Sequence, residues 1–273
     1  MAWVAAMTRT GLLSLGVLAI AAAANAGSIS MTTQQNAHLD GETLHVEISI
    51  TNTGDEAAHA VTPLVRFGGK EVRGKRIDAL QPNNSVKDML TVDVGRLSPG
   101  TWPYVVAVDY TDANQYPFQA VQGGRLTVGN PPPAKIAVSS MKAGKLAKTA
   151  TLTVVLKNLE GVARSVSVRL LPPDGIEAAP ATTELNFDPW QEKTLDVTLT
   201  NRTALPGSRY PVFAAVEYDD EGTHHAVLAQ GIVEVASPRA FLPRALLWVV
   251  GVLLLGWVAL LLARARARSR RAA

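Results

Sequence analysis

The chain contains no cysteine. Thiol nucleophiles, thiolate metal sites and disulfide frameworks are therefore excluded. Secreted eukaryotic domains of this size often carry disulfides, whereas a domain of about 100 residues can be held together by burial alone. Together with an abundance of Ala and Arg, this absence favours a bacterial protein.

Motifs that carry chemistry are also missing. The sequence has no Gly-x-Ser-x-Gly element and no His-Glu-x-x-His. We predict that Gly68-Gly69 and Gly123-Gly124 are turn glycines, because no helix follows them as a phosphate-binding loop requires. We expect no enzymatic activity and no cofactor.

A basic excess is missing from most of the chain, although the whole sequence has a formal charge of +3. All 23 acidic residues lie between Gly27 and Pro238, but eight of the 26 basic residues lie outside that region. The remaining 18 basic residues leave a formal charge of −5 there. Nucleic acid is therefore not an expected partner.

Residues 1–26 are typical of a signal peptide. Arg9 precedes an apolar run, and Ala24-Asn25-Ala26 predicts cleavage after Ala26. Translation from Met7 rather than Met1 would give the conventional order of charge and apolar core. An uncleaved N-terminal anchor is the alternative.

Residues 245–263 carry no charge. At about 1.5 Å per residue they would form a helix of roughly 28 Å, which predicts a single transmembrane span. The residues that follow, 264–273, form an arginine-rich tail that predicts a cytoplasmic C-terminus and contact with anionic lipid. Its topology-determining residues are Arg264, Arg266, Arg268, Arg270 and Arg271. We therefore expect a protein of the bacterial inner membrane with its N-terminal domains in the periplasm.

The exported part is duplicated. Residues 130–133 (Asn-Pro-Pro-Pro) form a linker, for which three prolines favour a stiff conformation. The flanking domains, 27–129 and 134–236, repeat the same features at an offset of 106 to 108 residues, and residues 237–244 form a juxtamembrane linker. The matched pairs are Leu44–Asn52 with Thr151–Asn158, Leu80–Pro82 with Phe187–Pro189, and Gly100–Tyr110 with Gly207–Tyr218.

Each copy has the pattern of an all-β domain. Leu44, Val46, Ile48 and Ile50 alternate with polar residues, as in a half-buried strand. Frequent turn residues predict about seven short strands per copy. The predicted fold is two tandem Ig-like or fibronectin-III-like antiparallel β-sandwiches followed by one C-terminal transmembrane α-helix.

Several motifs give the chain a family resemblance. Ile-Thr-Asn-Thr-Gly after an alternating strand, a Leu-x-Pro turn, and Leu-Ser-Pro-Gly-Thr-Trp leading into Val-Ala-Val-Asp-Tyr resemble the bacterial and archaeal Ig-like modules of the CARDB and NPCBM-associated type. The second copy carries the same order in weaker form. The resemblance implies adhesive or spacer domains in envelope proteins and brings no catalytic residues.

Two clusters are candidate metal sites. Asp109 and Asp112, with their counterparts Asp219 and Asp220, enter hairpins where carboxylates could hold calcium. Solvated hairpin turns explain the same residues, and no EF-hand spacing is present. His224 and His225 are adjacent on a strand, so they point to opposite faces and do not form one metal site.

The expected function is non-enzymatic: two Ig-like domains presented at the membrane to bind a protein partner or assemble an envelope complex. One alternative is a carbohydrate- or cell-wall-binding module, which requires an exposed aromatic platform on the strands of Trp102 or Tyr210. Another is a surface protein whose C-terminus is a sorting signal removed by processing.

Overall fold

The computed structural model describes residues 28–237, 248 and 251–261. The predicted signal peptide with its cleavage after Ala26, and the arginine tail at 264–273, lie outside the described residues. The predicted span at 245–263 lies partly outside them, as does the juxtamembrane linker. In the described part of the chain, no helix is both long enough and apolar enough to cross a bilayer. Residues 251–261 are helical.

The first domain contains eight strands. They are β1 (Met31–Asp40), β2 (Thr43–Asn52), β3 (Ala58–Phe67), β4 (Lys70–Arg73), β5 (Ile77–Leu80), β6 (Ser85–Asp93), β7 (Gly100–Thr111) and β8 (Pro117–Val128).

The second domain also contains eight strands. They are β9 (Ile136–Ala143), β10 (Thr149–Asn158), β11 (Arg164–Leu171), β12 (Ile176–Ala179), β13 (Thr182–Phe187), β14 (Glu192–Asn201), β15 (Arg209–Asp220) and β16 (Thr223–Glu234).

Alternating side chains explain why these segments form strands. In β2 every second residue is buried, and Leu44, Val46, Ile48 and Ile50 have no exposed area. Burying one such side chain contributes roughly 1.5–3 kcal/mol, so a one-residue slip in register would expose the whole set. The alternation read from the sequence is confirmed here.

Each domain is a β-sandwich. In the first, β1-β2-β6 faces a sheet in which β3 pairs with β4, β5 and β7, and β7 pairs with β8. In the second, β9-β10-β14 faces β13-β11-β15-β16. The fourth strand differs between the copies, since β4 pairs with β3 but β12 pairs with β14.

A buried asparagine at the end of the second strand marks the duplication most clearly. Asn52 and Asn158 have no exposed area, although Asn is mostly a surface residue. Each donates from Nδ2 to two backbone carbonyls and accepts from a backbone N–H two residues on. Asn52 donates to Glu56 and Leu80 and accepts from Gly54, and Asn158 donates to Val162 and Asp188 and accepts from Glu160.

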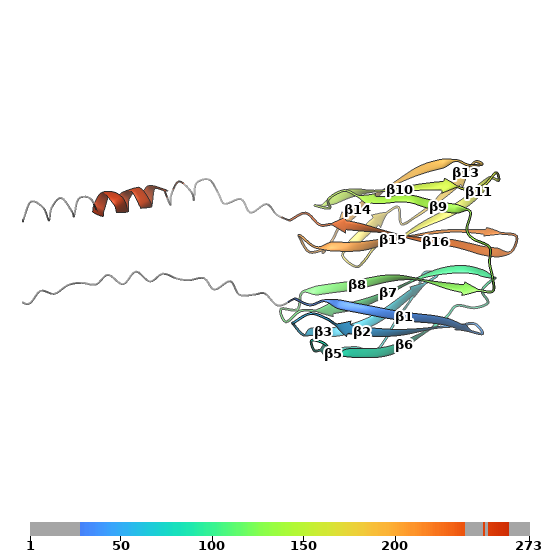
Figure 1. Cartoon of the computed structure of the whole chain (residues 1–273), viewed down its shortest axis with the longest axis horizontal. Helices are drawn as coiled ribbons and strands as arrows, with labels where there is room; N and C mark the ends of the chain where they lie inside the picture. Colours follow the sequence, from blue (N-terminus) through green and yellow to red (C-terminus); the bar gives the residue numbers. More distant parts are fainter. Residues whose placement is uncertain (1–27, 238–247, 249–250, 262–273) are drawn as a thin grey trace, which may run out of the picture.

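The two sandwiches lie side by side, with β15 and β16 next to β7 and β8 (Figure 1). Near their starts β16 and β7 run parallel and pair once, at His224 and Gly100. The counterpart of β7 in the second domain is β15, which runs antiparallel to β16 and hence to β7. The domains are therefore antiparallel to each other. The start of β1 and the end of β16 lie at one end of the pair, and the proline-rich linker lies at the other.

The prediction that Gly123 and Gly124 are turn glycines is wrong. Both lie inside β8. A Cβ at Gly123 would lie 2.6 Å from Leu228 Cδ2, in the second domain, and one at Gly124 would lie 2.2 Å from the Tyr104 ring. Glycine occurs inside this strand because other chain segments approach its backbone closely.

Candidate functional site at the domain interface

The interface between the domains has an apolar centre. On β7, Val106 and Val108 face the first core, while Val105 and Ala107 are buried outside it. On β15, Phe213 and Ala215 are likewise buried outside the second core. These strands are covered on both faces, as strands between two packed layers are. The domain interface is defined here by Leu64, Val105, Ala107, Gly123, Phe213, Ala215 and Leu228.

Two glycines let the backbones meet across this interface. A Cβ at Gly123 would lie 2.8 Å from Phe213 Cε1, in addition to its approach to Leu228. A Cβ at Gly100 would lie 2.2 Å from the His224 carbonyl oxygen. Gly100 also has a φ of 152°, which favours glycine. Larger residues at either position would push the domains apart.

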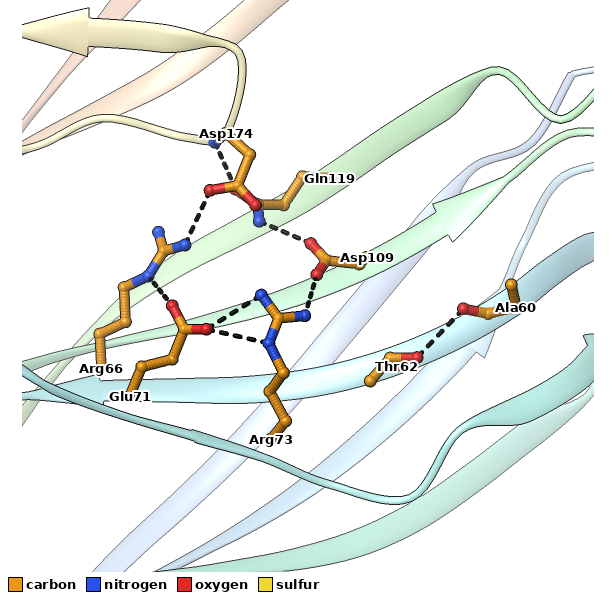
Figure 2. A network of polar contacts seen from close by, with 8 residues as sticks. All are labelled: Ala60, Thr62, Arg66, Glu71, Arg73, Asp109, Gln119 and Asp174. Atoms are coloured by element: carbon orange, nitrogen blue, oxygen red, sulfur yellow. Dashed lines mark hydrogen bonds and ion pairs between the residues drawn. The ribbon is translucent and has the colours of Figure 1, made fainter.

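A closed ring of polar contacts borders the apolar centre (Figure 2). The ring contains two guanidinium groups, three carboxylates and one amide, from Arg66, Glu71, Arg73, Asp109, Gln119 and Asp174.

Two contacts carry the ring across the interface. Arg66 Nη2 lies 2.8 Å from Asp174 Oδ1 in the second domain, while Arg66 Nε donates to Glu71 Oε2 at 2.8 Å. Gln119 Oε1 accepts from the Asp174 backbone N–H at 2.9 Å, and its Nε2 donates to Asp109 at 2.6 Å. The side chain of Arg66 is largely covered, so these charge-assisted bonds are screened less than ordinary surface pairs.

The ring shifts the pKa values of Glu71 and Arg66. A hydrogen bond from Arg66 lowers the pKa of Glu71, against the opposing effect of burial. Burial would lower the pKa of Arg66, but hydrogen bonds to Glu71 and Asp174 outweigh it and raise the pKa. These shifts favour the charged forms of Glu71 and Arg66, and the Arg66–Asp174 ion pair links the two domains.

A histidine is buried at the other end of the interface. The His224 ring stacks on Trp102 of the first domain, with ring centroids 3.7 Å apart and planes 13° apart. Its Nδ1 lies 2.9 Å from Asp219 Oδ1, and its buried Nε2 lies 3.5 Å from Glu217 Oε1. Burial alone would lower the pKa of the imidazole, but the two carboxylates outweigh burial and raise it.

A small cavity lies beside the polar ring. It has a volume of about 260 Å³ and is lined by Asp109, Tyr110, Phe118, Asp174 and Tyr210, among others. Ligand pockets usually begin at about 300 Å³. We interpret the cavity as a packing gap where the two domains meet.

The four predicted calcium residues are not brought together. Asp109 binds Arg73 and Gln119, and Asp112 accepts from backbone N–H groups of its own turn. Asp219 contacts His224, and Asp220 contacts Arg164. Because β7 and β16 run parallel, the two acidic hairpins lie at opposite ends of the pair. Within residues 28–237, 248 and 251–261, no group of three or more His, Asp or Glu could hold a metal ion.

The aromatic platform required by the carbohydrate alternative is not formed at the predicted positions. Tyr210 is buried, and its hydroxyl accepts from the Leu205 backbone N–H. Trp102 is partly buried between Phe67 and His224. Its indole N–H donates to the Ser98 carbonyl.

His224 stacks on Trp102 of the first domain, whereas His225 stacks on Tyr218 of its own domain. The two adjacent histidines therefore point to opposite faces of the strand.

An exposed apolar group that the sequence analysis missed lies elsewhere. Leu159 and Val162, in the β10–β11 turn, are 44% and 55% exposed, and Trp190, in the β13–β14 turn, is 62% exposed. The backbone N–H of Trp190 donates to the Glu160 backbone carbonyl at 3.0 Å, so the two turns are in contact. We call Leu159, Val162 and Trp190 the distal tip. The Leu159 N–H donates to the Lys135 carbonyl next to the proline-rich linker, which lies at the end opposite the start of β1 and the end of β16.

Comparison with known proteins identifies no family. No protein-family model matches the chain, and no curated protein matches it significantly. Among solved structures, trypsin-activated alpha-2-macroglobulin from Escherichia coli is 12% identical with a TM-score of 0.32, over 77% of this chain and 18% of that one. Red sea bream transglutaminase is 14% identical with a TM-score of 0.27, over 77% and 31%. The chain spans less than a third of either protein, and both TM-scores are below 0.5, so neither likeness supports an inference about this chain.

Proposed function

We propose that this chain is a non-enzymatic, membrane-anchored envelope protein that presents two Ig-like domains as one rigid unit to a protein partner. The observation that supports the proposal most is the position of the chain ends. The start of β1 and the end of β16 both lie at one end of the side-by-side pair, so an anchor that follows β16 would leave the opposite end projecting. The proposed anchor is the apolar segment at 245–263, with the arginine tail in the cytoplasm.

The domain interface supports the rigid part of this proposal. A buried apolar centre, the polar ring and the Trp102–His224 stack hold the domains at three separate places. A strand of 12 residues spans about 40 Å. The distal tip would therefore stand about that far from the membrane surface, beyond the reach of its lipids.

The proposed family relation is to the Ig-like modules of the CARDB and NPCBM-associated type. It is supported by the duplicated eight-strand sandwiches and by the asparagine that ends the second strand in each copy. Such modules bring no catalytic residues, which agrees with the engagement of the acidic hairpin residues in structural bonds.

A topology experiment tests the proposal. The full chain is expressed with a reporter either in the β1–β2 turn, at Glu42, or after Ala273. We expect the protein in the inner-membrane fraction, with the first reporter accessible to protease in spheroplasts and the second protected. The intact mass should retain the C-terminal segment. A soluble protein, a protected first reporter, or loss of everything after about residue 240 would contradict the proposal.

A further inference from the structure

The distal tip consists of large hydrophobic side chains that are exposed rather than packed in a core. Three of the six large hydrophobic side chains exposed within residues 28–237 are Leu159, Val162 and Trp190. A Cβ at Gly161, between the first two, would lie 3.5 Å from Trp190 Nε1. The indole therefore lies against the β10–β11 turn that carries Leu159 and Val162. Clustered apolar surface of this kind marks interaction sites more often than scattered single residues do.

The duplicated domain supplies an internal reference for Trp190. The β5–β6 turn of the first copy shares a backbone bond with the β13–β14 turn, since the N–H of Asn84 donates to Gln81 and that of Gln191 donates to Asp188. Asn83 therefore corresponds to Trp190. Both have positive φ, 62° and 60° respectively.

This backbone conformation suits Asn and strains a bulky residue. The second copy thus combines backbone strain with an exposed indole, where the first copy has a residue that fits. Strain that the fold could avoid with one substitution is retained most often where a side chain has a function.

The surroundings favour one class of partner. The two turns and adjoining strand ends carry three basic residues and three acidic ones, Lys157, Arg164, Lys193, Glu160, Asp188 and Glu192. This balance favours neither an anionic polymer nor an anionic lipid surface. Leu159 and Val162 lie on either side of Gly161, which faces the indole, and neither offers the hydrogen-bonding group that a sugar ring would need there. An aromatic anchor among aliphatic side chains with a neutral rim is typical of a protein–protein contact.

We propose that the distal tip docks into an apolar pocket on a protein partner in the envelope, with Trp190 as the side chain that fills the pocket. The position of the partner beyond the end of the domain pair rests on the proposed function. The contact itself needs only the tip.

Photo-crosslinking in intact cells tests this proposal. A photoreactive phenylalanine analogue replaces Val162 in the full chain, and in a matched control it replaces Glu56. These positions correspond, because Asn158 and Asn52 donate to their respective carbonyls. The Val162 derivative is also made with Trp190→Asn, which copies the turn of the first domain.

We expect one discrete protein adduct from position 162 and none from position 56. Its yield should fall at least about tenfold with Trp190→Asn, because a truncated anchor weakens binding by that order. Mass spectrometry should place the crosslink in an apolar pocket of a different protein, and the melting temperature of the Trp190→Asn chain should not fall.

Several results would overturn the inference: no adduct, an adduct to lipid, glycan or a second copy of the chain, equal yields from both positions, or a yield unchanged by Trp190→Asn. A lower melting temperature of Trp190→Asn would assign the indole a structural role instead. If the topology experiment succeeds while the crosslink fails, only the tip is wrong. If the reverse occurs, the anchor is wrong.

Discussion

Replacing Gly123 by alanine should separate the packing of the two domains from the stability of either one. The added Cβ would lie 2.6 Å from Leu228 Cδ2 and 2.8 Å from Phe213 Cε1, and both residues belong to the other domain. Leu228 is partly exposed and its methyl group can move aside. Phe213 is only 4% exposed, so its ring cannot move without disturbing the interface. Overpacking of this kind costs about 1–3 kcal/mol.

The measurement is thermal unfolding of the full chain in detergent. For a protein of this size we expect the melting temperature to fall by about 2–4 °C for each kcal/mol. Combining Gly123→Ala with Phe213→Leu should recover about 1 kcal/mol relative to the sum of the two single changes. Gly144→Ala is the matched control, because a Cβ there meets only the Thr151 carbonyl, at 4.0 Å. A Gly123→Ala variant as stable as the parent, or strict additivity with Phe213→Leu, would refute the described interface.

Three further predictions concern single side chains. Trp190→Asn should raise the free energy of unfolding by about 1 kcal/mol and Asn83→Trp should lower it by a similar amount, because bulky residues are strained at positive φ; urea unfolding that gives the opposite signs would refute the strain. Asn158→Ala should cost about 1–3 kcal/mol by leaving buried backbone groups without partners, whereas a loss below about 0.5 kcal/mol would mean that water replaces the amide. The pKa of His224 is raised in the folded protein. The extra stability of the parent over His224→Gln should therefore be fully present below pH 6.5, the ordinary pKa of histidine. It should be lost as the pH rises through the raised pKa of the folded protein. Melting temperatures of both proteins from pH 5 to 9 measure that difference, and a constant difference would contradict the pairing with Glu217 and Asp219.

Sequence patterns predicted the individual domains well. The alternation of Leu44, Val46, Ile48 and Ile50 specifies a half-buried strand without knowledge of its neighbours. The constant offset between the copies predicted a duplication, and Asn52 and Asn158 are buried at matching positions of the two copies. These features depend on local periodicity, which sequence reveals directly.

The contact between the domains was missed, although one signal for it exists. The runs Tyr104–Val108 and Pro211–Val216 are apolar without alternation, as expected for strands buried on both faces. Side-chain pairs that lie far apart in the sequence leave no pattern from which their contact can be predicted. Asp109 is a calcium candidate in the sequence, and only the fold brings Arg73 against it. The sequence signal for Trp190 is one residue beyond the matched prolines, Pro82 and Pro189, where the first copy has Asn83 and the second has Trp.

We propose that the two domains form one rigid unit whose free end lies opposite the start of β1 and the end of β16. Because the chain has no native cysteine, Glu42→Cys and Glu192→Cys allow specific spin labelling of one exposed position in each domain. Electron–electron distance measurements on the doubly labelled full chain should give a single narrow distribution that does not change with ionic strength. A broad distribution spanning tens of ångströms would mean that the proline-rich linker lets the domains move independently, and would contradict a rigid pair.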